Sequence, residues 1–209
     1  MLEIIKNNFD HNFIEKIFTY YNRLNLTNKK DGVQNNFFYK SGNYHNRTEI
    51  FIGKPINDYL KNMLYCPNIF VLIYVLENME LFKDKLFIDN GCGIGFLSVF
   101  LKHIGFTCYN YDNYTQLDHI NFNPQNLELY KDIMIPSSIP PNNISDFKVL
   151  ISCGIWVDNE ILINNIYDYL FLDMYNFDGF SNECKINLNN YKLIKNYNNM
   201  LLVFKHKDI

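Results

Sequence analysis

The chain contains 209 residues, which is enough for one well-packed domain and little more. Hydrophobic residues make up 48% of the chain and charged residues 20%, so the composition excludes an intrinsically disordered protein. With 19 basic and 22 acidic side chains the formal net charge is -3. Nucleic acid is therefore not favoured as a partner, and a small molecule or a protein is expected instead.

The cysteines and histidines do not form the patterns that disulfide frameworks or metal sites need. The five cysteines are odd in number and contain no CxxC pair, and the five histidines make no pair at metal-ligand spacing. The start of the chain lacks a basic segment followed by an apolar core. Its longest apolar run, Ile69–Leu76, is far shorter than the roughly 20 residues of a membrane span. We expect a cytoplasmic protein with no metal and no membrane partner.

The N-terminal part of the chain predicts a helix followed by a polar segment. Apolar residues recur at helical spacing between residues 9 and 21, and either Asn8 or Asp10 could cap this helix. Residues 26–48 are polar and rich in turn-forming residues, which indicates a loop or a segment that orders on binding. The apolar face of the helix consists of Phe13, Ile14, Ile17, Phe18 and Tyr21.

A second helix is predicted from Pro67 to about Leu81, because proline is favourable at the first helical position. The β-branched residues of this segment leave a strand as the alternative.

Two regions of the chain are expected. Residues 1–66 form an N-terminal helical and loop cap, and residues 67–209 form the main domain.

From Lys85 onward, short apolar runs alternate with helical periodicity. Gly105 lies where a helix over residues 97–104 would end. Near the C-terminus, two apolar runs flank Asn198-Asn199, which is typical of a β-hairpin. The predicted strands are 86–88, 107–111, 127–130, 147–152, 169–172, 191–197 and 200–205, and a further short helix is predicted at 159–166.

This order of elements predicts an α/β fold. Repeated strand–helix units imply a mostly parallel sheet with right-handed crossovers and helices on both faces. The antiparallel hairpin would complete the sheet at its C-terminal end.

The strongest chemical feature is a glycine-rich turn between a predicted strand and a predicted helix. It contains Gly91, Gly93 and Gly95, and Asp89 precedes the first of them by two residues. Glycines let a ligand approach the backbone closely, and the N–H groups at the start of a helix favour an anionic group. Asp112 ends the next strand, 112 − 91 = 21 residues beyond the first glycine. An acid at that place can accept hydrogen bonds from two ribose hydroxyls.

These features alone also admit a nicotinamide cofactor, and the spacing of the glycines argues against it. A dinucleotide-binding turn has glycines at its first, third and sixth positions. Here the sixth position is Phe96, which is bulky where close packing of helix and strand needs a small residue, and the fifth is glycine. An oxidoreductase that uses NAD(P) therefore remains as a less favoured alternative.

Residues Asp89 to Gly95 resemble the first motif of the class I S-adenosylmethionine-dependent methyltransferases, which have a Rossmann-like fold. That motif is an apolar strand, an acid and a Gly-x-Gly-x-Gly turn. The resemblance extends over about residues 67–205. It includes the run 147–152, which is similar to the family's fourth strand, and the C-terminal hairpin, which is similar to its sixth and seventh strands.

The resemblance implies S-adenosyl-L-methionine as the cofactor and assigns roles to single residues. Asp89 would order the turn and help to hold the methionine amino group. Asp112 would hold the ribose, and Asp132 would contact the adenine. The residues that the resemblance implies for cofactor binding are Asp89, Gly91, Cys92, Gly93, Gly95, Asp112, Asp132 and Ser152. No catalytic residue is assigned, because methyl displacement needs mainly alignment of the reactants.

The acceptor of the methyl group is not defined by the sequence. Relatives that methylate planar nitrogens carry Asn or Asp followed by Pro-Pro and an aromatic residue after the fourth strand, whereas this chain has Ser152 to Trp156 there. Trp156 and Tyr175 could line an acceptor pocket or could be packing aromatics, and Cys153 is interpreted as a small buried residue. We expect a small or medium-sized acceptor. A module that binds the cofactor without catalysis is the main alternative.

Overall fold

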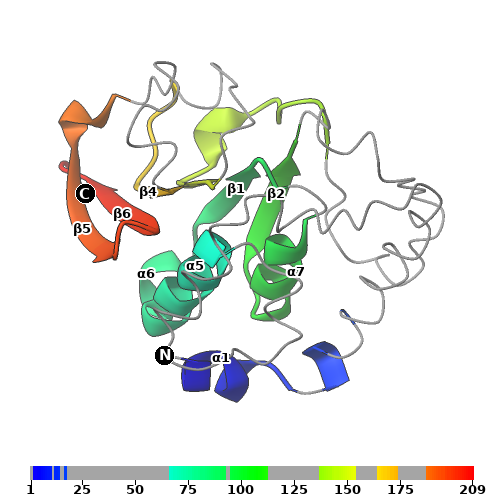
Figure 1. The fold of residues 1–209 in the computed structure, drawn as a ribbon. Helices are drawn as coiled ribbons and strands as arrows, with labels where there is room; N and C mark the ends of the chain where they lie inside the picture. The colour runs from blue at the N-terminus through cyan, green and yellow to red at the C-terminus, as the bar shows by residue number, and fades with distance from the viewer. Residues whose placement is uncertain are drawn as a thin grey trace, which may run out of the picture. The chain divides into compact units, whose positions relative to one another are not determined.

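The computed structural model describes residues 2–10, 12–14, 17, 66–92, 95–112, 137–153, 164–173 and 187–209 (Figure 1). Two compact units make up the chain. The first contains helices α1 and α5, and the second contains α6, α7 and all the strands named below. No helix in the described part of the chain has both the length and the apolar character that a membrane crossing requires.

The first unit begins with α1 (Leu2–Asn8), a helix that the sequence did not predict. Residues 12–14 and 17 are also helical, which confirms the predicted helix where it is described. Of the two candidate capping residues, Asp10 has this role, since its Oδ1 atom accepts a hydrogen bond of 2.7 Å from the Phe13 N–H. Ile14 and Ile17 are buried, as the predicted apolar face requires. Phe18 and Tyr21 lie outside the described residues.

The segment for which the sequence admitted a helix or a strand is a helix, α5 (Cys66–Glu77). Residues 67–76 are all buried, and α5 packs against α1. A helix that is apolar around its whole circumference is expected to be buried in this way. The predicted helix was longer, reaching Leu81. In the structure it ends at Glu77, and after Asn78 a short separate helix follows, α6 (Met79–Phe82).

The second unit is built on a six-stranded mixed sheet with the order β2-β1-β3-β4-β6-β5. Its first four strands in this order are parallel, and β6 and β5 are antiparallel additions. The α/β prediction is confirmed at this level. The strands are β1 (Leu86–Asn90), β2 (Thr107–Tyr111), β3 (Val149–Ser152), β4 (Tyr169–Asp173), β5 (Tyr191–Tyr197) and β6 (Leu201–His206).

Helix α7 (Phe96–His103) connects β1 to β2 and packs against β2 (Figure 1). Ile104 is its C-cap, and Gly105 follows with a φ of 95°, which confirms that the helix ends at this glycine. The next strand, β3, pairs with β1 and not with β2. The connection after β2 therefore carries the chain to the other side of β1. The strand order therefore reverses at β1.

Both faces of the sheet are apolar, as expected for parallel strands covered on two sides. On one face the Phe82 ring of α6 contacts the rings of Phe87, Tyr169 and Phe171, with centroids 5.6, 5.0 and 6.0 Å away. The alternate residues of the same strands point to the other face. The buried cluster there contains Ile88, Tyr111, Ile144, Leu150, Tyr167, Leu170, Leu172, Leu202 and Phe204.

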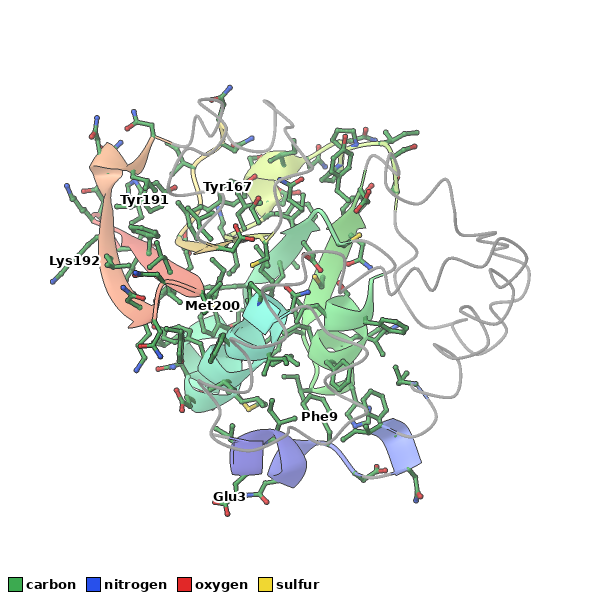
Figure 2. The ribbon with its side chains drawn as sticks, viewed as in Figure 1. Glu3, Phe9, Tyr167, Tyr191, Lys192 and Met200 are labelled. Carbon is green, nitrogen blue, oxygen red and sulfur yellow. The ribbon has the colours of Figure 1, made fainter. Side chains whose placement is uncertain are left out.

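The C-terminal hairpin is confirmed. Asn198 and Asn199 have φ values of 51° and 61°, and the Met200 N–H donates a 2.9 Å hydrogen bond to the Tyr197 carbonyl, which closes the turn. Strand β5 lies at the edge of the sheet, and most of its side chains are exposed, including that of Lys192, which extends outward in Figure 2. At its start, the Tyr191 hydroxyl accepts a 2.9 Å hydrogen bond from the Tyr167 N–H.

Three further predicted segments fall wholly or partly outside the described residues. The loop 26–48 and the strand 127–130 lie outside them. Of the helix predicted at 159–166, only residues 164–166 are described, and these form a turn and a bend without helical structure, so the helix does not reach that far.

Candidate functional site

Buried polar side chains gather at one edge of the parallel sheet. Asp89 and Asn90 end β1, Ser152 ends β3, Asp173 ends β4, and Asp112 directly follows β2. All five are buried. Because parallel strands point the same way, their carboxyl ends share one edge. Ligands of open α/β sheets bind at this edge, where the strand order reverses, and in this sheet the reversal occurs at β1.

The glycine turn after β1 is tied to the end of β2. The backbone N–H groups of Gly91 and Cys92 both donate to the Tyr111 carbonyl, at 2.8 and 3.1 Å. Gly91 has a φ of 82°, a left-handed conformation that glycine adopts without strain. Asp112 is the residue after Tyr111, so these two hydrogen bonds hold the turn next to the carboxylate that the sequence singled out.

The second half of the turn leads directly into α7. Gly95 is the residue before the helix, with a φ of 80°, and its N–H donates to the Cys92 carbonyl at 3.0 Å. The Gly95 carbonyl then accepts a 3.3 Å hydrogen bond from the Val99 N–H in the first turn of the helix. Two left-handed glycines therefore shape the turn, and Gly93 lies outside the described residues.

The pKa of Asp89 departs strongly from the ordinary value of an aspartate. Its side chain is 2% exposed, and its Oδ2 atom is buried and accepts no hydrogen bond from any residue that the structure describes. Burial, together with the nearby charge of Asp112, raises the pKa of Asp89 from its ordinary 3.8 to about 8. The Asp89 carboxyl therefore keeps its proton at neutral pH. A positively charged ligand beside Asp89 would favour the ionised carboxylate and lower this pKa.

The thiols beside Asp89 are not nucleophiles. Burial raises the pKa of Cys92 and of Cys108, and Asp89 raises both further once its own carboxyl is ionised. Neither thiol therefore ionises near neutral pH. Cys153, which follows β3, is also a buried thiol, in agreement with its interpretation as a small buried residue. Among the described residues no three His, Cys, Asp or Glu side chains are grouped so that they could hold a metal ion.

Two further polar contacts stiffen this edge of the sheet. Asn90 Nδ2 donates a 3.3 Å hydrogen bond to Ser152 Oγ, across β1 and β3. Ser98 in α7 donates its hydroxyl to the side-chain oxygen of Asn110 in β2. The sequence did not single out Asn90 and Asn110. The chain contains many asparagines, and nothing in the sequence distinguishes these two buried ones from those that are exposed.

Asp173 was also missed, although a signal for it exists. The strand Tyr169–Asp173 ends an apolar run with an acid, as β1 does at Asp89. The predicted strand ended at Leu172, one residue before this acid. In the structure Asp173 is buried at the same edge of the sheet as Ser152.

The structure brings together most of the residues predicted for cofactor binding. Six of the eight lie in the turn or at the adjacent strand ends, namely Asp89, Gly91, Cys92, Gly95, Asp112 and Ser152. The other two, Gly93 and Asp132, lie outside the described residues, as do Trp156 and Tyr175. Asp112 is 7% exposed, so it does not point into bulk solvent. No protein-family model matches the chain, and no curated protein matches it either.

Proposed function

We propose that this protein is an S-adenosylmethionine-dependent methyltransferase with a Rossmann-like fold and an N-terminal helical cap. One observation carries the proposal. A glycine turn with two left-handed residues is tied to the end of β2 between two buried acids, Asp89 and Asp112, where the strand order reverses. The antiparallel β5–β6 hairpin supports the same proposal, because it has the place that the family's last two strands have in the chain.

The residues present fit the cofactor. It carries an ammonium group, a carboxylate, a ribose and an adenine, and the site offers a group for each of the first three. Asp89, whose buried Oδ2 has no described donor, would accept the ammonium group. The N–H groups of the glycine turn and of the start of α7 suit the carboxylate. Asp112 would accept hydrogen bonds from the ribose hydroxyls.

The chain's own part in the reaction would be orientation. The bound cofactor supplies a methyl group activated by a positively charged sulfur. The protein must hold that methyl in line with the acceptor atom, and alignment of this kind can supply about 7–11 kcal/mol of the barrier. The buried network of Asn90 and Ser152 keeps the carboxyl ends of β1 and β3 in place for this purpose.

Phe96 supports the methyltransferase over the nicotinamide enzyme. It is the first residue of α7 and is buried. A dinucleotide-binding turn would need a small residue here, so that the helix could approach the strand closely. We further propose a cytoplasmic location, which the buried thiols of Cys92, Cys108 and Cys153 support.

Calorimetric titration of the full chain with S-adenosylmethionine and, separately, with NADH tests the proposal. Binding of the first ligand without binding of the second is expected. Binding of NADH alone would overturn it. Incubation with a methyl-labelled donor and fractionated cell extract then tests catalysis, and transfer to a small or medium-sized acceptor is expected. Binding without transfer to any fraction would favour the non-catalytic module.

A further inference from the structure

A buried hydrogen bond joins the first turn of α7 to β2. Ser98, the third residue of α7, donates its hydroxyl to the side-chain oxygen of Asn110 in β2. Both residues are only 1% exposed. The Sγ atom of Cys108, also in β2, lies 3.1 Å from the Ser98 hydroxyl oxygen. Three polar side chains therefore meet between the helix and the strand.

The single proton of the Ser98 hydroxyl belongs in the bond to Asn110. An amide oxygen is a stronger acceptor than a sulfur atom, and burial raises the pKa of Cys108, so this thiol keeps its own proton. The Cys108 S–H can then donate to the Ser98 oxygen. The hydroxyl is used both as a donor and as an acceptor, which fixes its orientation.

This bond holds the start of α7 against the part of β2 that leads to the site. The first N–H groups of a helix have no acceptor within the helix, and the residue before α7 is Gly95, which has no side chain to cap them. The proposed function assigns these N–H groups to the carboxylate of the ligand.

On the side of the sheet, Asn110 lies between the two acids of the site. It precedes Asp112 by two residues, and its Cα atom is the register partner of Asp89 in the pairing of β1 with β2. The Ser98 bond therefore connects the helix start to the strand position that is next to both acids.

We propose that Ser98 is a positioning residue that, through Asn110, fixes the start of α7 relative to Asp112, so that the site selects a ligand with a carboxylate and a ribose in one molecule. This inference rests on the proposed function. The Ser98 side chain is buried against β2 and is used by Asn110, so it acts through the placement of the helix and not by contact with the ligand.

Two ligands separate this role from a general effect on stability. S-adenosylhomocysteine carries both the carboxylate and the ribose, whereas methylthioadenosine has the same nucleoside without the amino acid part. Without the bond to Asn110, the start of α7 is free to shift relative to β2. A ligand held at both ends then loses affinity, and a ligand held only by its nucleoside does not.

Titration calorimetry of Ser98→Ala with both ligands tests the inference. S-adenosylhomocysteine should bind about three- to tenfold more weakly than to the unaltered protein, the effect expected for the loss of one hydrogen bond. The affinity for methylthioadenosine should not change. Val99→Ala is the control, since Val99 is also buried in the first turn of α7 and the substitution removes packing without removing a hydroxyl. It should leave the ratio of the two affinities as it is.

A double-mutant cycle with Asn110→Ala tests the route of the effect. If Ser98 acts through Asn110, Ser98→Ala should have no further effect on the affinity for S-adenosylhomocysteine in the Asn110→Ala background. An equal loss in both backgrounds would give Ser98 a different role and would overturn the inference.

The outcomes also separate this inference from the proposed function. Failure of the unaltered protein to bind either ligand would overturn the proposed function itself. Binding of both ligands, with the same affinity ratio in Ser98→Ala as in the unaltered protein, would overturn only the positioning role. If Asn110→Ala does not fold, the two ligands compared in Ser98→Ala and Val99→Ala still decide. If methylthioadenosine binds too weakly to measure, the double-mutant cycle decides.

Discussion

Asn90 and Ser152 join the carboxyl ends of β1 and β3 through a buried side-chain hydrogen bond of 3.3 Å from Asn90 Nδ2 to Ser152 Oγ. Their Cα atoms are partners in the parallel register. The two residues are 62 positions apart in the chain. Since β2 lies on the other side of β1, this bond holds together the place where the strand order reverses.

A double-mutant cycle measures this contact. Asn90→Ala, Ser152→Ala and the double variant should show a coupling of about 0.5–1.5 kcal/mol in the free energy of unfolding, the usual net contribution of a hydrogen bond. Urea denaturation gives the four values. The control cycle pairs Asn90→Ala with Ser145→Ala, an exposed serine in the η4 turn (Ile144–Asp146), and should show no coupling. Equal couplings in both cycles would contradict the assignment.

Asp112→Asn tests the proposed ribose contact. Hydrogen bonds to a charged group contribute about 1.5–3 kcal/mol, so binding of methylthioadenosine should weaken by about tenfold or more. This ligand has the sugar and lacks the ammonium group, so the effect of Asp112 on Asp89 does not enter. Titration calorimetry provides the measurement. Asp146→Asn makes the same chemical change on the exposed η4 turn and should leave affinity unchanged. Unaltered binding in Asp112→Asn would remove the ribose role.

Gly95→Ala and Gly105→Ala place the same strain at the two ends of α7. Their φ values are 80° and 95°, and a left-handed conformation costs a non-glycine residue about 1–2 kcal/mol. No atom lies within 4 Å of a Cβ at Gly105, so strain of the backbone alone is expected there. Both variants should lose stability in urea, and the loss should be at least as large for the buried Gly95 as for the exposed Gly105. Only Gly95→Ala should weaken binding of S-adenosylhomocysteine, and equal affinities in the two variants would contradict the role of the turn.

The pH dependence of stability tests the state of Asp89 without any ligand. Its carboxyl has a pKa of about 8 in the folded protein and 3.8 ordinarily, so folding takes up a proton between these values. The stabilisation is complete below about pH 4 and is lost as pH rises toward 8, by up to about 1.4 kcal/mol per pH unit.

Asp89→Asn should remove this loss. Urea midpoints measured from pH 5 to pH 9 should show the unaltered protein losing stability relative to the variant as pH rises. Asp146→Asn is the control and should keep a constant difference. If the curves for the unaltered protein and Asp89→Asn run parallel over the whole range, Asp89 is ionised in the folded protein and the assignment is wrong.

The hairpin turn allows a test of the fold alone. Asn198 has a φ of 51°, and asparagine tolerates this conformation better than a β-branched residue does. Asn198→Val should lower the free energy of unfolding by about 1–2 kcal/mol, whereas Asn198→Gly should be close to neutral. Urea denaturation distinguishes them. A stable valine variant would show that the turn has another conformation in solution.

Local patterns predicted the second unit well and the first unit less well. Strand β2 has the predicted bounds, and the Asn198-Asn199 turn and the end of α7 at Gly105 are as predicted, because each depends on a few consecutive residues. Helix α1 was missed because its seven residues are too few to show a helical period clearly. The apolar residues of β5 do not indicate burial, since Leu193 and Ile194 are both exposed on this edge strand.

The sequence by itself determined the chemistry that is available at the glycine turn. The order of Asp89 and the three glycines that follow it, Gly91, Gly93 and Gly95, is local, and glycine is the residue that adopts a positive φ without strain. Only the tertiary structure decided that β3 lies beside β1, that Asn90 meets Ser152, and that Asp89 is buried near Asp112. The pKa of a carboxyl depends on desolvation and on charges that are close in space, and long-range strand pairing brings these together over distances in the chain that no local pattern records.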